Sequence, residues 1–132
     1  MRIYVAAKFE KKDMVRAMYA QIRALGHEIT YDWTTHKFIE PYVEHEDIAQ
    51  KYAENELAGI AACDVLIFIS DEHGTTLPME FGAASLRCFM TGKPIVYVVG
   101  EWNTKSPWFF ASHVRRRETI EEVLKELTKT SP

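Results

Sequence analysis

The run Val65-Leu66-Ile67-Phe68-Ile69-Ser70 is apolar and leads directly into Asp71-Glu72-His73-Gly74-Thr75-Thr76 and then Leu77-Pro78-Met79-Glu80-Phe81-Gly82. The pattern predicts a buried strand at residues 65–70 and a helix at residues 77–90. A turn of small residues between a strand and a helix leaves backbone N–H groups available to an anion or a sugar hydroxyl. Asp71 ends the strand and Glu80 lies in the first helical turn, so both carboxylates are expected in one crevice. Open α/β sheets bind ligands at this edge, which predicts a ligand site here.

Strand and helix patterns alternate along the rest of the chain. Further strands are predicted at residues 3–7, 28–33, 94–99 and 108–114, and further helices at 14–25, 46–63 and from 119 onwards, with a frayed tail at 128–132. Asp13 and the capping box Thr119-Ile120-Glu121-Glu122 are helix-start signals, and Gly26 is a stop signal. This alternation predicts one Rossmann-like α/β domain, a parallel sheet with helices on both faces. The long loop at 34–45 is a candidate functional segment.

Composition restricts the class of protein. The 132 residues suit one domain, and 47% hydrophobic with 27% charged residues is ordinary for a globular chain. A net charge of -3 argues against a nucleic-acid partner. No signal-peptide layout is present, and no apolar run approaches the ~20 residues of a membrane span, so a cytoplasmic protein without membrane contact is expected. Cys63 and Cys88 form neither a CxxC pair nor a disulfide framework and are expected to be buried thiols.

Motifs for metals and common cofactors are missing from the sequence. The five histidines show no HxxxH or HxH spacing. The segment Ala6-Ala7-Lys8-Phe9-Glu10-Lys11-Lys12 after the first strand is neither a dinucleotide fingerprint nor a Walker A loop. It also lacks the acidic pair of a phospho-receiver domain. We therefore predict neither a metal nor a cofactor.

Glu56 stands out by its position in the helix predicted at residues 46–63. At 100° per residue it falls in the middle of an apolar arc. The arc is formed by Ile48, Tyr52, Ala53, Leu57 and Ile60. A carboxylate there must be paired, neutral or at the end of a cavity. Two alternatives stay open: a structural role, with Glu56 turned to solvent or paired with a basic residue, and a third acid aimed into the pocket.

Several of these segments together resemble the nucleoside 2-deoxyribosyltransferase family, which includes deoxynucleoside 5'-monophosphate N-glycosidases. The resemblance covers about residues 1–100. It rests on Tyr4 in the first strand, Asn55-Glu56-Leu57-Ala58-Gly59-Ile60, Cys63-Asp64-Val65-Leu66 and the stretch from Gly74 to Gly82. Its most specific part is Glu80-Phe81-Gly82-Ala83-Ala84.

The resemblance implies a fold and a set of roles. It implies a flavodoxin-like five-stranded parallel sheet and a homodimer or a dimer of dimers. Glu80 matches the nucleophile of the family, and Tyr4 matches a tyrosine beside that carboxylate and the sugar. Glu56 matches an acid that interacts with the sugar or the leaving base.

The chain also departs from the family pattern. The helix acid is usually Asp rather than Glu56, and the transferases have an acidic residue where this chain has Gly74. No clear equivalent of the Asn-bearing transferase tail is present. The hydrolases hold a 5'-phosphate with Ser or Arg after the first strand, where this chain offers Lys8, Lys11 and Lys12. Transfer and hydrolysis both remain open.

The chemistry of an N-glycosidic bond suits these residues. Its cleavage builds positive charge on C1' and the ring oxygen, which a carboxylate such as Glu80 can trap. Tyr4 is expected to hydrogen-bond to Glu80, and Glu56 or Asp71 to act on the base or the sugar hydroxyls. Three groups are predicted to bind substrate: the loop residues Ala6 and Lys8; the base-stacking Phe9, Trp33 and Met79; and Gly74, Thr75 and Thr76 at the 5' end.

Other interpretations are compatible with the same residues. Glu80 can simply favour a helix N-terminus through the helix dipole, and Tyr4 and Trp33 can be ordinary core aromatics. Two other function classes remain: a non-catalytic nucleotide-binding or sensing module, and an NAD-cleaving glycohydrolase. The consecutive aromatic residues Trp108, Phe109 and Phe110 predict an exposed interface, in keeping with an oligomer.

Overall fold

A computed structural model of the chain describes residues 1–72 and 79–130. Within these ranges five strands form one parallel sheet: β1 (Arg2–Ala6), β2 (Glu28–Ile29), β3 (Val65–Ile69), β4 (Ile95–Val99) and β5 (Val114–Arg117). Their order is β2-β1-β3-β4-β5. This is the flavodoxin-like order, in which the chain changes direction across the sheet between β1 and β3. The predicted fold class is confirmed.

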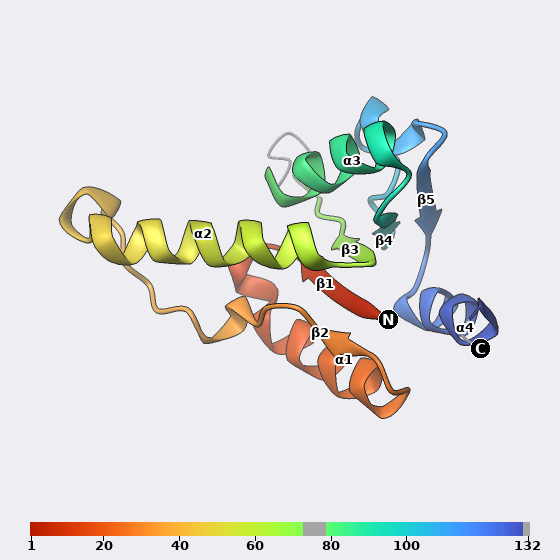
Figure 1. Cartoon of the computed structure of the whole chain (residues 1–132), viewed down its shortest axis with the longest axis horizontal. Helices are drawn as coiled ribbons and strands as arrows, with labels where there is room; N and C mark the ends of the chain where they lie inside the picture. Colours follow the sequence, from red (N-terminus) through yellow and green to blue (C-terminus); the bar gives the residue numbers. More distant parts are fainter. Residues whose placement is uncertain (73–78, 131–132) are drawn as a thin grey trace.

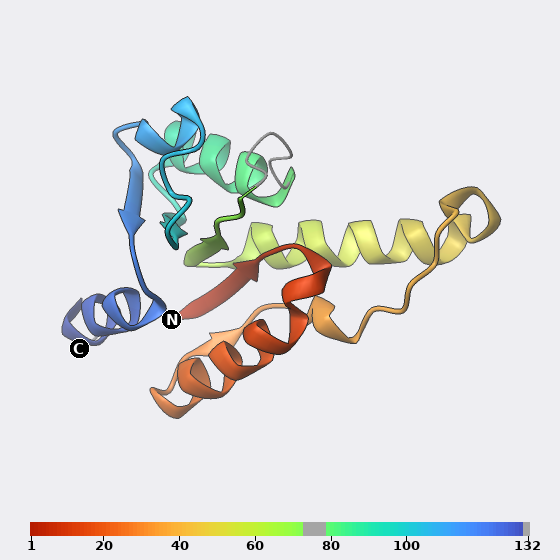
Figure 2. The same cartoon turned by 180° about the vertical axis from the view of Figure 1, so that it is seen from behind.

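Helices cover both faces of the sheet. The described residues form α1 (Lys12–Ala24), α2 (Glu46–Ala62), α3 (Met79–Thr91) and α4 (Ile120–Thr130). Figure 1 shows α2 and α3 on one face and α1 and α4 on the other, and the reverse view in Figure 2 agrees. The carboxyl ends of β1 and β3 therefore lie between the two layers of helices. Sheets of this kind bind ligands at that edge.

The strand β3 lies in the core and is buried at all five positions. A strand enclosed on both faces is apolar throughout, as VLIFI is here. On the α3 face, the Phe68, Phe81 and Phe109 rings pack with centroids 5.3–5.8 Å apart. Aromatic pairs in such tilted or edge-on arrangements add about 0.5–1.5 kcal/mol to the area they bury. Phe109 is thus a core residue, which corrects its prediction as part of an exposed cluster.

The predicted final strand at residues 108–114 is wrong. Ser106 accepts a hydrogen bond from the backbone N–H of Trp108 at 3.2 Å and caps a short 3-10 turn, Pro107–Phe110. A proline at the start of the turn and a serine cap before it favour helical geometry over an extended chain. The last strand begins later, at Val114.

The second strand is also shorter than predicted. Trp33 lies in a 3-10 turn, Trp33–Thr35, rather than in a strand, because Asp32 accepts a hydrogen bond from the backbone N–H of Thr34 at 2.9 Å. The Trp33 indole N–H donates to the Val5 carbonyl at 2.6 Å. This hydrogen bond ties the turn to the carboxyl end of β1.

Helix ends agree with the sequence signals in part. Gly26 has the expected positive φ of 86° after α1, and Thr119 accepts from the backbone N–H of Glu122 at 3.3 Å, as a capping box requires. Asp13 does not cap α1, because a 3-10 turn at Phe9–Lys11 runs into the helix without a side-chain cap. Thr128 belongs to α4 rather than to a frayed tail, and its hydroxyl donates to the Leu124 carbonyl.

The N-terminal half of α2 and the segment before it extend away from the rest of the domain (Figures 1 and 2). Ile48 and Leu57 are exposed, whereas Ile60 is buried. The apolar arc predicted for this helix is therefore only partly buried, because the sheet supports α2 near its C-terminal end alone. None of the helices described in residues 1–72 and 79–130 is both long and apolar enough to span a membrane.

Candidate active site

Gly59 brings α2 against the first strand. A Cβ atom at this position would lie 2.8 Å from Tyr31 Cβ and 3.1 Å from the ring of Tyr4. Only glycine permits this approach, because real Cβ atoms do not come so close to other carbons. The C-terminal half of α2 consequently forms one wall beside the Tyr4 ring.

Glu56 lies one turn before Gly59 and is half-buried. Burial, together with the nearby Glu80 carboxylate at the start of α3, raises the pKa of Glu56 to about 7. Among residues 1–72 and 79–130, neither glutamate forms an ion pair with a basic side chain. The open question about Glu56 is settled in one respect: it is not paired with a described lysine or arginine. The charge of Glu80 on α3 therefore acts on the carboxyl group of Glu56 on α2.

Tyr4 is fully buried between these elements. Its hydroxyl has no hydrogen-bond partner in the part of the chain that the structure describes, so the expected bond to Glu80 is not formed here. Burial and the charges of Glu56 and Glu80 raise the pKa of this phenol, which keeps it protonated. An unpaired buried hydroxyl costs about 1–3 kcal/mol of stability. Four other buried side-chain atoms also lack a described partner, so Tyr4 is set apart by the two carboxyl charges that act on it, an arrangement typical of functional sites.

Asp71 is paired with Lys8 rather than with the two glutamates. The Lys8 Nζ lies 2.9 Å from Asp71 Oδ2. Their hydrogen bond lowers the pKa of Asp71 and raises the pKa of Lys8, so both stay charged at neutral pH. This pair joins the loop after β1 to the end of β3.

The other lysines of the same loop also contact protein groups. Lys11 Nζ donates to the Ser70 carbonyl at 2.8 Å. Lys12 Nζ lies 4.8 Å from the centroid of the Phe9 ring. Lys8 and Lys11 therefore join the loop to the end of β3, whereas Lys12 contacts only Phe9 of its own segment, and a role of the three lysines as a phosphate clamp stays a prediction.

The predicted substrate-binding residues are placed as follows. Ala6 is buried at the end of β1, and Phe9 is half-buried with its centroid 6.5 Å from that of Trp33. Trp33 is only 5% exposed, whereas Met79 is 89% exposed. Gly74, Thr75 and Thr76 lie outside the described residues. The roles of these residues in binding stay predictions.

An aromatic group that begins one helical turn from Glu56 was not predicted from the sequence. The Tyr31 hydroxyl and His36 Nε2 are 2.6 Å apart, and the His36 ring stacks on Tyr52 with centroids 3.7 Å apart and an interplanar angle of 3°. Tyr52 and Glu56 are four residues apart on α2, so they share a face. That spacing is the one signal in the sequence that links this group to the site.

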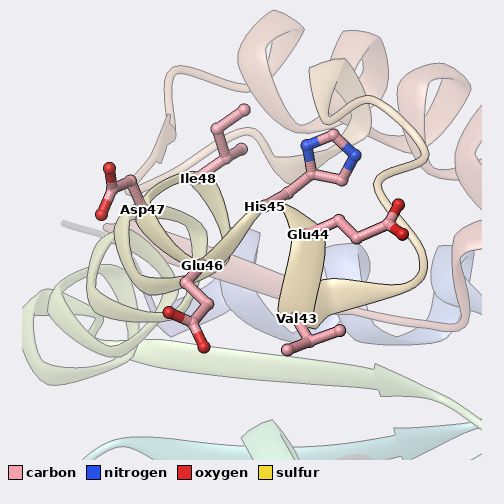
Figure 3. A pocket seen from close by; sticks show the side chains of 6 residues that line it. All are labelled: Val43, Glu44, His45, Glu46, Asp47 and Ile48. Carbon is pink, nitrogen blue, oxygen red and sulfur yellow. The ribbon is translucent and has the colours of Figure 1, made fainter.

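A cavity of about 370 Å³ lies elsewhere, where the 3-10 turn Tyr42–Glu44 meets the start of α2. It is lined by residues 43–48, and Figure 3 shows the Glu44, Glu46 and Asp47 carboxylates pointing in different directions. Glu56 follows the last lining residue, Ile48, by eight residues of the helix, about 12 Å at the usual helical rise. No group of three or more metal-ligating side chains is found in the described ranges. This cavity is not part of the site around Tyr4.

Comparison with known proteins finds a solved structure with the same fold. No protein-family model and no curated protein matches the sequence. A solved structure, the CMP N-glycosidase BcmB of Clostridium botulinum, is similar with a TM-score of 0.56. The match covers 96% of this chain and 98% of that one at 19% sequence identity. A likeness at this identity establishes a shared fold.

Proposed function

We propose that this protein cleaves the N-glycosidic bond of a nucleoside or nucleotide, as a relative of the nucleoside 2-deoxyribosyltransferases and nucleotide N-glycosidases. The observation that carries the proposal is the arrangement of Glu80, Glu56 and Tyr4. The Glu80 charge acts both on Glu56, whose pKa is near 7, and on Tyr4, whose phenol has no hydrogen-bond partner among the described residues. The fold shared with a CMP N-glycosidase supports the same reaction class.

The three groups have separate tasks in this proposal. The Glu80 carboxylate attacks C1', and the C1'–N bond breaks as a glycosyl ester forms. Glu56 gives its proton to the departing base. Water then attacks C1' of the ester, its proton goes to Glu56, and Glu80 is released as a carboxylate. Once a ligand is bound, the Tyr4 hydroxyl donates a hydrogen bond to a sugar oxygen or to the Glu80 carboxylate.

Electrostatics favour Glu56 over Asp71 as the proton donor. Asp71 is held ionised by Lys8 and has no proton to give at neutral pH. It remains suited to accept a hydrogen bond from a sugar hydroxyl. A carboxyl group whose pKa lies near the working pH is the better general acid.

A 5'-monophosphate remains the favoured substrate and hydrolysis the favoured reaction. An ammonium group has three donors, so Lys8 can bind a phosphate while one donor stays on Asp71. Transfer to a second base lacks the support of an evident transferase tail.

The test compares base release from deoxynucleosides with release from their 5'-monophosphates, each with and without a second free base. We expect faster release from the monophosphates and no new nucleoside. Faster turnover of the unphosphorylated compounds with formation of a new nucleoside would restore the transferase interpretation. NAD is included in the panel, and release of nicotinamide alone would favour the NAD-cleaving alternative. Binding of nucleotides without any release of base would favour the sensing module.

We also propose that the protein is a homodimer or a dimer of dimers. Exposed apolar side chains gather on α3 and the turn after β4: Leu86, Phe89, Met90, Trp108 and Phe110. Phe89 alone is 74% exposed, and patches of this kind usually mark an interface. Light scattering at tens of micromolar is expected to give at least twice the chain mass. A monomer at that concentration would reject this proposal.

A further inference from the structure

Three residues of α2 share one face and meet different neighbours. Tyr52, Glu56 and Gly59 follow at four-residue and three-residue spacing, which places them along one stripe of the helix. At one end of the stripe Gly59 touches Tyr4 and Tyr31. At the other end Tyr52 stacks on His36. Glu56 lies between these two contacts, so the aromatic group begins one helical turn from the carboxyl group.

His36 is held in place on two sides. Its Nε2 is 2.6 Å from the Tyr31 hydroxyl, and one face of its ring lies flat on Tyr52. Tyr52 is itself fixed, because its hydroxyl accepts the backbone N–H of Lys37 at 3.0 Å. The imidazole therefore has a defined orientation although it belongs to a segment with little regular structure.

The other ring nitrogen is available. His36 Nδ1 has no hydrogen-bond partner within residues 1–72 and 79–130. Burial lowers the pKa of His36, so the ring is neutral at pH 7. A neutral imidazole offers one donor and one acceptor. Because Nε2 is bonded to Tyr31, Nδ1 can offer the other of these two hydrogen-bonding roles to a ligand. All three rings are half-buried rather than buried, so the group is not simply core packing.

We propose that Tyr31, His36 and Tyr52 form the wall that receives the leaving base, with His36 Nδ1 hydrogen-bonded to the base edge as a specificity-determining contact. This inference rests on the proposed function, since Glu56 must reach the same base to protonate it. Flat aromatic faces accept any nucleobase, whereas a hydrogen bond with Nδ1 distinguishes an amino from an oxo substituent when the Tyr31 hydroxyl keeps the imidazole in one tautomer. A site built to pair such a group discriminates strongly against an analogue that leaves it unpaired.

The experiment replaces His36 with Phe, which keeps a flat ring against Tyr52 and removes both nitrogens. The probes are the 5'-monophosphates of deoxycytidine, deoxyuridine, deoxyadenosine and deoxyguanosine. For the best substrate we expect KM to rise about tenfold or more, the loss usual for one hydrogen bond in a buried site, while kcat changes less. The preference among the four bases should shrink. Tyr31→Phe should give a smaller rise in KM, since Nδ1 remains but loses its fixed orientation.

His113→Phe is the matched control. His113 also bonds a side-chain hydroxyl, that of Ser85 at 2.8 Å, and also lies near an aromatic ring, Phe89 at 6.0 Å. It belongs to the α3 and β5 side of the sheet, so its replacement should leave KM and base preference unchanged. An His36→Phe protein that unfolds at the wild-type temperature yet keeps the wild-type KM and base ranking would overturn the inference.

A second readout does not depend on turnover. The ring nitrogens of His36, assigned in 15N spectra by their loss in His36→Phe, should shift when a nucleotide binds to Glu80→Gln. If the His36 nitrogens shift but the wild-type protein releases no base, the base-binding wall is supported and the proposed reaction is rejected. Base release from the wild-type protein without a shift at His36 would reject the wall and retain the reaction. Absence of a shift with all four probes overturns the inference in either case.

Discussion

Replacement of Glu80 by Gln is expected to lower the rate of base release by about 10³-fold or more, because the amide cannot form the glycosyl ester. The fold and nucleotide binding should survive, since Gln has nearly the same shape and the Glu80 carboxylate forms no ion pair with a described residue. Removal of the charge also removes one cause of the raised pKa of Glu56. The measurement is single-turnover base release, with binding followed separately by calorimetry.

Glu121→Gln is the control for a purely structural role of Glu80. Glu121 lies in the first turn of α4, as Glu80 lies in the first turn of α3. If Glu80 only favoured the helix dipole, both substitutions would cost about 0.3–1 kcal/mol of stability and neither would affect catalysis. Base release by Glu80→Gln at a rate near that of Glu121→Gln would refute the assignment of the nucleophile.

Local patterns predicted the parts of the site that depend on one element. The apolar run at residues 65–70 has the composition of a strand buried on both faces, and β3 is such a strand. Glu56 stands out in the sequence because a carboxylate in an apolar arc needs an explanation, and its role stays a prediction because the arc itself is only partly buried. Helical spacing gives direction around an axis, but it does not tell how far the sheet extends beneath the helix.

Contacts between segments that are distant in the sequence could not be predicted from local patterns. Lys8 and Asp71 are 63 positions apart, and their ion pair follows from the adjacency of β1 and β3. The ring of His36 meets Tyr52 because the segment before α2 runs outward and the helix then returns to the sheet (Figure 1), and no periodic pattern encodes this path. Trp33 left the predicted strand because of a cap from Asp32, a local signal that strand propensity outweighed in the prediction.

Glu56→Gln is expected to change the pH dependence of stability. The pKa of Glu56 is about 7 in the folded protein against an ordinary value of 4.5. Between these values the folded state binds more protons than the unfolded state, so the free energy of unfolding falls as the pH rises. Gln cannot ionise and avoids this loss. At pH 8 the variant should therefore be more stable than the wild type by about 1–3 kcal/mol, the scale of a shift of this size after allowance for partial exposure.

The same substitution should act in the opposite direction on catalysis. The wild-type rate of base release should fall as the pH rises through about 7, because Glu56 loses the proton that the leaving base needs. Glu56→Gln should be slower by about 10²–10⁴-fold, the usual contribution of a general acid, and should lose that dependence on pH. Glu54→Gln, on the exposed side of the same helix, is the control and should match the wild type in both measurements.

A Glu56→Gln protein that gains stability at pH 8 but keeps the wild-type pH profile would leave Glu56 as a half-buried acid without a part in proton transfer. If stability rises and activity falls over the same pH range, one carboxyl group explains both effects. Its ionisation then destabilises the fold, and its proton is the one that the leaving base takes.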